Sequence, residues 1–288
     1  LLGSSHLCAV CYARPTHQYL GFGAGTDFER RIVVKTNAAQ LLRAKFARPS
    51  WRGENLVFSG VTDCYQPLEA SYGLTRQCLE VCAEYRQPVG IITKGALVER
   101  DVDLLAGLAE HGAATVFVSV PFADAEDSRA IEPFVALPER RLRAMRALAD
   151  AGVPVGVSVS PLIPGLNDHQ IPAILEAARD AGATQAFYVM LRLPAEVYDV
   201  FRERLQAAFP LRVDKVMSLV QSMRGGRHND ARFGSRMRGE GARYQLMADL
   251  FAKTAAKLGL TSPLAAESRS PFRRPHQEQW LFGEEQSS

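Results

Sequence analysis

Short apolar runs rich in β-branched residues alternate along the chain with longer stretches whose apolar residues recur at helical spacing. The short runs are nearly continuous, which is typical of parallel strands covered on both faces. Glycine follows three helical stretches, at Gly112, Gly152 and Gly182, where it commonly ends a helix. We therefore predict an α/β fold, a partial (β/α)6 TIM-like parallel barrel. The predicted strands are 31–35, 55–58, 89–93, 115–120, 154–160 and 184–191, and the predicted helices are 38–47, 74–85, 101–111, 139–151, 168–181 and 195–207.

The chain is long enough to bury one main core, since 47% of its 288 residues are apolar. We expect this core barrel over residues 1–210, with its first strand truncated. An Arg/Gly-rich extension with a helix is expected over 211–260, and a flexible tail over 261–288. The chain starts at Leu1, which we interpret as a missing natural N-terminus.

Charge and composition exclude several classes of protein. The 34 basic and 31 acidic residues nearly balance, so no global attraction to nucleic acid or to an anionic membrane is expected. No run of 18 apolar residues and no signal-peptide pattern occurs, which predicts a cytoplasmic protein without membrane contact. Five cysteines are an odd number and favour metal or redox chemistry over a disulfide framework. We expect a monomer.

Polar residues recur where the predicted strands end, and in a barrel the loops at those ends build the site. Ordinary loop polarity could explain each residue alone, but the recurrence favours a functional site. Lys94 also allows a rival hypothesis, because a desolvated lysine at a strand end could form a Schiff base in a barrel lyase. The strand-end residues are Ser59, Thr62, Asp63, Thr93, Lys94, Ser119, Ser158, Ser160 and Arg192.

Cys8 and Cys11 are the strongest candidates for metal chemistry. Two cysteines three positions apart on a loop preceded by glycine can direct both sulfurs to one soft metal centre. A redox pair or two packed thiols would give the same spacing. Cys78 and Cys82 have helical spacing within an amphipathic stretch, so we expect them in the core.

The segment 223–243 carries six arginines against two acidic residues. Such a segment could contact the phosphates of a nucleic acid, or it could cover the barrel mouth as a lid. A third interpretation makes the chain a nucleic-acid-binding module without catalysis, although few aromatic residues are interleaved for stacking.

The stretch from Gly3 to His17, GSSHLCAVCYARPTH, resembles the CxxxCxxC cluster loop of radical S-adenosylmethionine proteins, in the form found in the spore photoproduct lyase-like branch. Further matches to that branch follow in order at 59–67, 91–94, 161–168 and 223–239, and so cover most of the chain.

This resemblance implies a reduced 4Fe-4S cluster that cleaves S-adenosylmethionine to a 5′-deoxyadenosyl radical, which abstracts hydrogen from a substrate. It also implies an electron donor as partner and a lyase-like reaction on an unknown substrate, with nucleic acid as the suggested class. Cys64 would be a hydrogen-atom donor, and a plain buried thiol is its alternative. The implied cofactor-binding residues are Tyr12, Ser59, Gly60, Thr62, Asp63, Lys94, Ser119, Ser158, Ser160, Ile163 and Asn167, and the implied metal-binding positions are Cys8, Cys11 and Ser4.

Ser4 departs from the family pattern, because the first cysteine of the motif belongs at this position, four residues before Cys8. A serine hydroxyl is a harder and more basic ligand than a thiol, so it should hold an iron–sulfur cluster poorly. We interpret Ser4 as an introduced substitution, since the downstream motifs are retained. The alternative is a cluster-deficient relative that binds nucleic acid without turnover.

Overall fold

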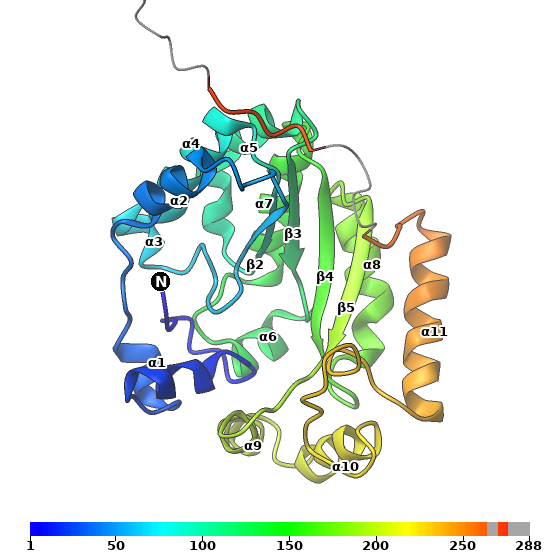
Figure 1. Ribbon diagram of the computed structural model, residues 1–288. Coiled ribbons are helices and arrows are strands. Elements are labelled where there is room, and N and C mark those ends of the chain that lie inside the picture. The colour runs from blue at the N-terminus through cyan, green and yellow to red at the C-terminus, as the bar shows by residue number, and fades with distance from the viewer. Residues whose placement is uncertain (264–269, 276–288) are drawn as a thin grey trace, which may run out of the picture.

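The computed structural model describes residues 1–263 and 270–275. One sheet of five parallel strands runs through the described residues, and its spatial order β1-β2-β3-β4-β5 follows the chain order (Figure 1). A sequential parallel sheet arises from repeated βα units and confirms the predicted α/β, partial barrel fold. The strands are β1 (Leu56–Phe58), β2 (Val89–Thr93), β3 (Ala114–Ser119), β4 (Val155–Leu162) and β5 (Gln185–Met190).

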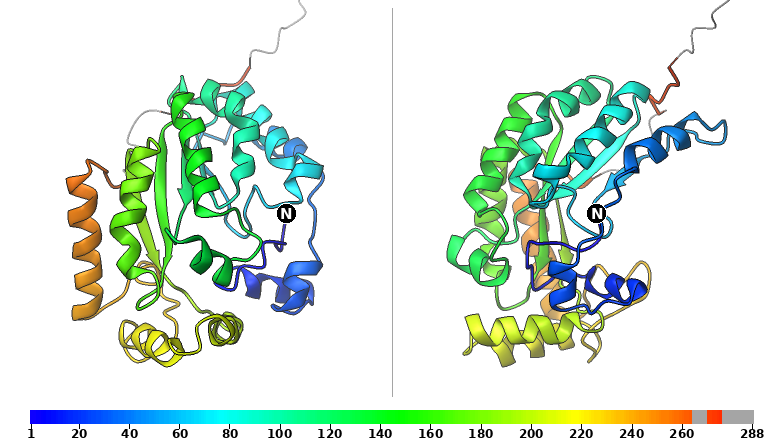
Figure 2. Two further views of the ribbon diagram at one scale, coloured as in Figure 1. Left: turned by 180° about the vertical axis from the view of Figure 1, so that it is seen from behind. Right: turned by 90° about the vertical axis from the view of Figure 1, so that its left-hand side faces the viewer.

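Helices between successive strands cover the outer face of the sheet (Figure 2). Their apolar faces meet the strands in one core, where side chains such as Leu79, Leu105 and Leu148 pack near Ile91 and Val157, all fully buried. Each strand is therefore apolar along nearly its whole length. These helices are α4 (Leu74–Tyr85), α5 (Val102–Ala109), α7 (Pro138–Asp150) and α8 (Ile171–Asp180), whereas α6 (Ala125–Ile131) lies at the carboxyl end of the sheet.

A second apolar cluster lies at the carboxyl end of the sheet, where Phe201 and Val216 pack with Phe122 and Ile163. The helices that supply it follow β5 and lie below the sheet in Figure 1. The elements outside the βα units are η1 (Arg14–Leu20), α1 (Thr26–Arg30), α2 (Ala38–Ala47), α3 (Glu69–Tyr72), η2 (Ala96–Asp101), η3 (Asp168–Gln170), α9 (Val197–Ala208), α10 (Val213–Ser222) and α11 (Ala242–Lys257).

The strand predicted at 31–35 is wrong. Val33 forms only an isolated antiparallel bridge with Leu2, through two hydrogen bonds of 2.9 and 3.0 Å. This run is short, is flanked by Arg31 and Lys35, and contributes no residue to the buried core, so nothing holds it in the sheet.

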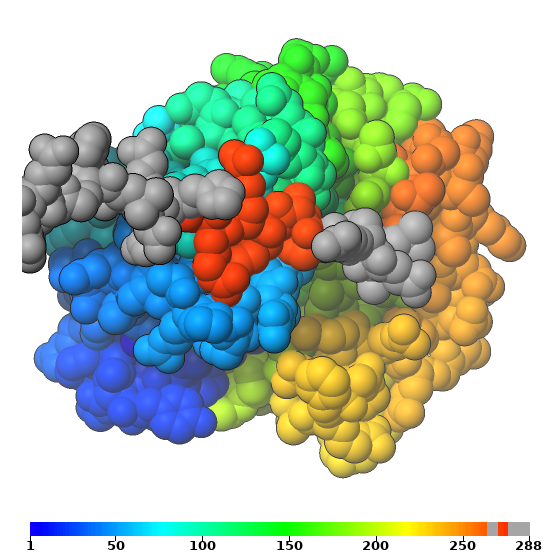
Figure 3. Space-filling view, turned by 45° about the horizontal axis from the view of Figure 1, so that its top comes forward, coloured from blue at the N-terminus to red at the C-terminus, as the bar shows by residue number. Residues whose placement is uncertain are grey.

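The predicted flexible tail, 261–288, lies outside the described residues except for 261–263 and 270–275. The second of these segments runs past the amino ends of the strands in Figure 1, and Figure 3 shows it in red on the surface of the molecule. Phe272 stacks on Tyr85 with ring centroids 6.0 Å apart and meets Phe46 edge-on at 5.9 Å. Arg273 N donates to Tyr85 O at 2.8 Å. Gly53 lies so close to Phe272 that a Cβ at this glycine would overlap the phenylalanine side chain.

Within residues 1–263 and 270–275, no helix has both the length and the apolar character that crossing a membrane requires.

Candidate active site

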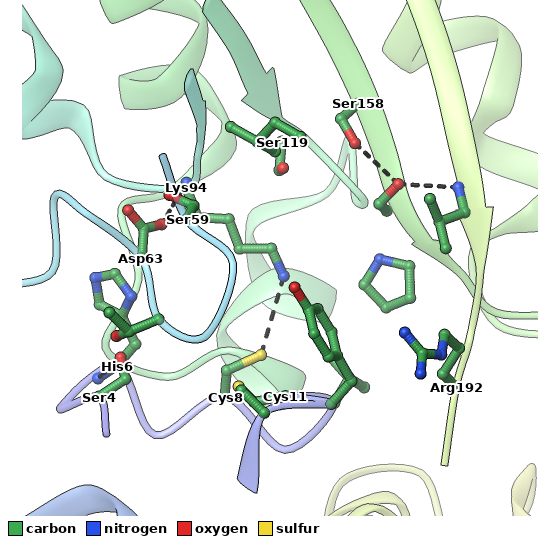
Figure 4. A pocket seen from close by; sticks show the side chains of 18 of the residues that line it. Ser4, His6, Cys8, Cys11, Ser59, Asp63, Lys94, Ser119, Ser158 and Arg192 are labelled. Carbon is green, nitrogen blue, oxygen red and sulfur yellow. Dashed lines mark hydrogen bonds between the residues drawn. The ribbon is translucent and has the colours of Figure 1, made fainter. Parts of the chain in front are cut away.

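A pocket of about 270 Å³, the strand-end pocket, opens at the carboxyl ends of the strands (Figure 4). The loop that carries Cys8 and Cys11 forms one wall, and the ends of the strands form the other. Positions spread along the sequence from Ser4 to Arg192 are thus brought together at one site. The residues named from the sequence that line it are Ser4, Cys8, Cys11, Tyr12, Ser59, Thr62, Asp63, Thr93, Lys94, Ser119, Ser158, Ser160 and Arg192.

The cysteine loop is held from behind by a buried arginine. The guanidinium of Arg14 donates to Cys8 O at 3.1 Å and to Ala24 O at 3.0 Å, and it pairs with Glu29 at 2.5 Å. On the other side, Thr62 Oγ1 donates to Gly3 O at 2.7 Å. These contacts fix the loop backbone, so the thiols have a defined position before any ligand binds.

Both thiols of the loop point into the strand-end pocket (Figure 4). Burial raises the pKa of Cys11, and it raises the pKa of Cys8 to about 12 although the Lys94 ammonium opposes this shift. The Ser4 side chain lines the same pocket, and its Oγ accepts a 3.3 Å hydrogen bond from His6 N. The loop therefore presents two neutral thiols and one hydroxyl.

A buried charge cluster adjoins Cys8 and contains a residue that the sequence analysis missed, Glu132. Its carboxylate pairs with Lys94 Nζ and, at 2.7 Å, with Arg141 Nη2. Burial would raise the pKa of Glu132, but the two cations outweigh it and lower this pKa to about 2. The Cys8 thiol donates to Glu132 Oε1 at 3.6 Å, and Lys94 Nζ lies 3.9 Å from Cys8 Sγ.

Lys94 is held in its protonated form. Burial would lower its pKa, but the proximity of Cys8 and the ion pair with the Glu132 carboxylate outweigh burial and raise it. A protonated amine is not nucleophilic, so this arrangement disfavours the Schiff-base hypothesis. It favours contact between the ammonium and an anionic group of a ligand.

Asp63 ties the loop after β1 to the end of β2. Its carboxylate accepts from Thr93 Oγ1 at 2.6 Å and from Lys94 N at 2.7 Å. Ser59, at the start of this loop, has φ of 91°, and its hydroxyl donates to Cys64 Sγ at 3.2 Å. The Cys64 thiol has a pKa raised well above its usual range by burial, and it does not line the strand-end pocket.

The β4 and β5 wall carries the serines. Ser158 Oγ donates to Ser160 Oγ at 2.9 Å, and Ser160 Oγ also accepts from Val189 N at 2.9 Å, so Ser160 accepts both bonds and can still donate its own proton to a ligand. Two other residues named from the sequence do not reach the strand-end pocket. Ile163 is buried in the second apolar cluster, and Asn167 is buried with its amide donating to Pro121 O at 2.7 Å.

Tyr12 closes the mouth of the pocket opposite β5. Its hydroxyl donates to Gly60 O at 3.1 Å. Gly60 does not line the pocket itself, so it acts on the site only by holding Tyr12 through this hydrogen bond. The guanidinium of Arg192 lies over the Tyr12 ring, 5.1 Å from its centroid. Met237 of the Arg/Gly-rich segment also lines the pocket, and its carbonyl accepts from Met190 N at 3.1 Å.

Residues 3–178 match the model of the Radical SAM superfamily, which covers more than half of the chain. The chain belongs to the radical SAM superfamily. The resemblance to a radical SAM protein is thereby confirmed, and membership of this superfamily implies an iron–sulfur cluster and S-adenosylmethionine as cofactors.

The radical SAM chain is 37% identical over 221 residues to an uncharacterized protein of Mycobacterium tuberculosis (strain ATCC 25618 / H37Rv). That match covers 76% of this chain and 65% of the relative, so the chain spans just under two thirds of the length of the curated relative. Two solved structures share the fold at 15% identity, and each covers 91% of this chain and 74% of its own. They are a spore photoproduct lyase complexed with dinucleoside spore photoproduct, with a TM-score of 0.62, and a double mutant of that lyase with bound AdoMet and the same dinucleoside, with a TM-score of 0.61.

The side chains present fit the radical SAM cofactors with one departure. Cys8 and Cys11 supply soft sulfur ligands, whereas Ser4 supplies a hard oxygen. No group of three His, Cys, Asp or Glu side chains that could hold a metal ion occurs in residues 1–263 and 270–275. Two thiols of the expected three are thus available for a cluster, while the serines, Lys94 and the apolar walls suit an amino-acid nucleoside.

Proposed function

We propose that this chain is a radical SAM enzyme that generates a 5′-deoxyadenosyl radical and uses it for lyase-like hydrogen abstraction, with nucleic acid as the substrate class. The fold shared with the two lyase structures, which hold a dinucleoside photoproduct, supports this substrate class. An electron donor would be a further partner, and the cytoplasmic location and monomeric state stay predictions from the sequence.

In this proposal Cys8, Cys11 and Ser4 hold a 4Fe-4S cluster. When bound, the cluster and S-adenosylmethionine supply the radical that abstracts a hydrogen atom from the substrate. The protonated Lys94 would hold the carboxylate of S-adenosylmethionine, and the loop from Ser59 to Asp63 would hold its amino group. The wall with Ser119, Ser158 and Ser160 would accommodate the ribose and adenine, and Tyr12 would cover the mouth and keep water out.

The observation that carries the proposal is the direction of the Cys8 and Cys11 sulfurs, which face the same pocket as the Lys94 ammonium (Figure 4). Soft sulfur ligands with a fixed cation beside them are what a cluster and the carboxylate of S-adenosylmethionine require. The pocket is not lined by Cys64, Ile163 or Asn167. In this proposal these three residues support the walls of the pocket from behind.

The test is anaerobic reconstitution of Ser4→Cys with iron and sulfide. We expect several-fold more bound iron than in the unaltered chain, a brown colour and cleavage of S-adenosylmethionine to 5′-deoxyadenosine, because a third thiolate replaces a hard ligand. Adding Cys8→Ser to this variant should abolish the gain. Cys78→Ser, on α4 and outside the pocket, is the matched control and should leave it unchanged. A Ser4→Cys protein that stays colourless would defeat the proposal.

Ser4 itself favours one second candidate, a cluster-deficient relative that binds nucleic acid without turnover. This candidate predicts retention of nucleic acid that falls steeply with salt concentration and is lost when Arg224 and Arg227 are replaced by Gln. A gel-shift series over salt concentration measures it. Retention without any gain of iron in Ser4→Cys would favour this candidate over the enzyme.

A further inference from the structure

Three arginines converge beside the strand-end pocket where β5 ends. Arg192 follows β5 and lines the pocket, and Arg224 follows α10. The Arg224 guanidinium donates to Leu191 O at 2.7 Å and to Arg236 O at 3.0 Å, which connects the Arg/Gly-rich segment to the end of β5. Arg236 stacks on the ring of Phe233 at 5.1 Å.

None of the three arginines forms an ion pair with a carboxylate within the part of the chain that the structure describes. The nearby acid Asp230 is occupied by Arg232 at 3.0 Å and by the Ser235 hydroxyl at 2.7 Å. The buried Nε of Arg192 has no hydrogen-bond partner among the described residues. A donor of this kind costs free energy unless something accepts from it.

The positive charges of these arginines also repel one another. Burial first, and then the charge of Arg236, lower the pKa of Arg192. Burial likewise lowers the pKa of Arg224, where Arg192 adds to the effect and Asp230 partly offsets it. Folded proteins pair their buried charges, so a buried arginine beside two half-buried ones, with no carboxylate partner in the described chain, indicates a site completed by an anion from outside.

We propose that Arg192, Arg224 and Arg236 form an anion subsite that binds a phosphodiester group of the substrate. A guanidinium matches the oxygens of a phosphate with two parallel N–H donors, and stacking on Tyr12 fixes the plane of Arg192 at the pocket mouth. Lys94 lies on the opposite wall beside Cys8, so the two sets of cations serve different ligands. The subsite rests on the proposed function, since it supplies the substrate class of the same pocket.

Binding of a dinucleotide tests the subsite, because the probe contains a single phosphodiester. We would titrate the full chain with thymidylyl-(3′→5′)-thymidine and with its uncharged methylphosphonate analogue, by isothermal titration calorimetry at low salt. The charged probe should bind about tenfold more tightly than the analogue, as one charge-assisted hydrogen-bond pair provides. Arg192→Gln and Arg236→Gln should each remove this preference and leave the weak binding of the analogue unchanged.

Arg202→Gln is the matched control, since it removes the same charge from an exposed position on α9 and should preserve the preference. Arg192→Lys keeps the charge but loses the planar fork, and we expect it to retain only part of the preference. Circular dichroism of each variant separates loss of binding from loss of folding, and the partly exposed Arg236 serves as the second test if Arg192→Gln does not fold.

Equal binding of both probes by the unaltered chain would overturn the subsite. So would inorganic phosphate binding as tightly as the dinucleotide, which would make it a site for free phosphate. S-adenosylmethionine binding is measured in parallel, and a matching loss in Arg192→Gln would assign the arginine to the carboxylate of that cofactor. If the unaltered chain and its Ser4→Cys variant both fail to bind S-adenosylmethionine while the dinucleotide preference persists, the proposed function fails and the subsite stands.

Discussion

The two walls of the strand-end pocket handle buried charge in opposite ways. Beside Cys8, the carboxylate of Glu132 pairs with both Lys94 and Arg141, so each of these charges has an ion-pair partner within the protein. Beside Tyr12, Arg192 and its neighbours have no carboxylate partner in the described residues. The cations of the first wall have a carboxylate partner in the protein, whereas those of the second depend on a ligand for one. Charge balance thus separates the part of a site that the fold builds for itself from the part that the ligand completes.

The largest expected effect on stability comes from removing the carboxylate charge of Glu132 from the wall beside Cys8. Glu132→Gln keeps the shape of the side chain but leaves Lys94 and Arg141 without a counter-charge, and such a loss typically costs about 3 kcal/mol of unfolding free energy. Urea denaturation of the cluster-free protein measures it. Glu139→Gln, which removes the same charge from an exposed i,i+4 pair, should change stability by less than about 0.5 kcal/mol. Comparable losses of unfolding free energy in the two variants would show that the buried Glu132 ion pairs stabilise the protein no more than the exposed pair does.

Acid should reduce the stability that the Glu132 ion pairs provide, over a defined range of pH. The pKa of Glu132 is about 2 in the fold and about 4.3 in an unfolded chain. A lowered folded-state pKa stabilises the protein fully above the unfolded value, and this contribution disappears as pH falls from about 4.3 towards about 2. The stability difference between the unaltered chain and Glu132→Gln should therefore be constant above about pH 5 and shrink below about pH 4. A pH series of urea midpoints measures it, and a difference that does not vary down to about pH 3 would contradict this.

The smallest expected effect on stability comes from removing the charge of Arg192 from the wall beside Tyr12. Arg192→Gln removes a cation that has no acidic partner in the described chain, so the unfolding free energy should change by less than about 1 kcal/mol and in the stabilising direction. Thermal melts in chloride buffer measure this shift, and addition of sulfate should reduce it because the anion neutralises the arginines of the unaltered chain. A destabilisation as large as that of Glu132→Gln would end the distinction between the two walls.

The sequence predicts the strands of the sheet well, because a buried parallel strand is recognisable from its own residues as a short apolar run. The run at 89–93 is β2 itself, and the other four strands of the sheet lie within two residues of their predicted bounds. The exception at 31–35 shows the limit of this signal, since a short apolar run needs a partner strand, and Val33 finds only Leu2.

The site was predictable where its residues follow strands or form a motif, as with Cys8, Lys94 and Ser158. Glu132 was not, because it ends a short helix and gains its role only from contact with Lys94, 38 residues away in sequence. Asn167 illustrates the reverse, since its motif position suggested the cofactor while its amide holds the loop after β4 through Pro121. Local sequence records the backbone more directly than it records charge pairs between distant segments.

Phe272 has a consequence for the order in which the molecule is made. Its ring completes the aromatic group around Phe46 and Tyr85, and Gly53 leaves the space that it enters. Translation reaches Phe46 more than two hundred codons before Phe272. Helices α2 and α4 therefore leave the ribosome with an uncovered aromatic surface, which stays uncovered until the chain has been made as far as Phe272.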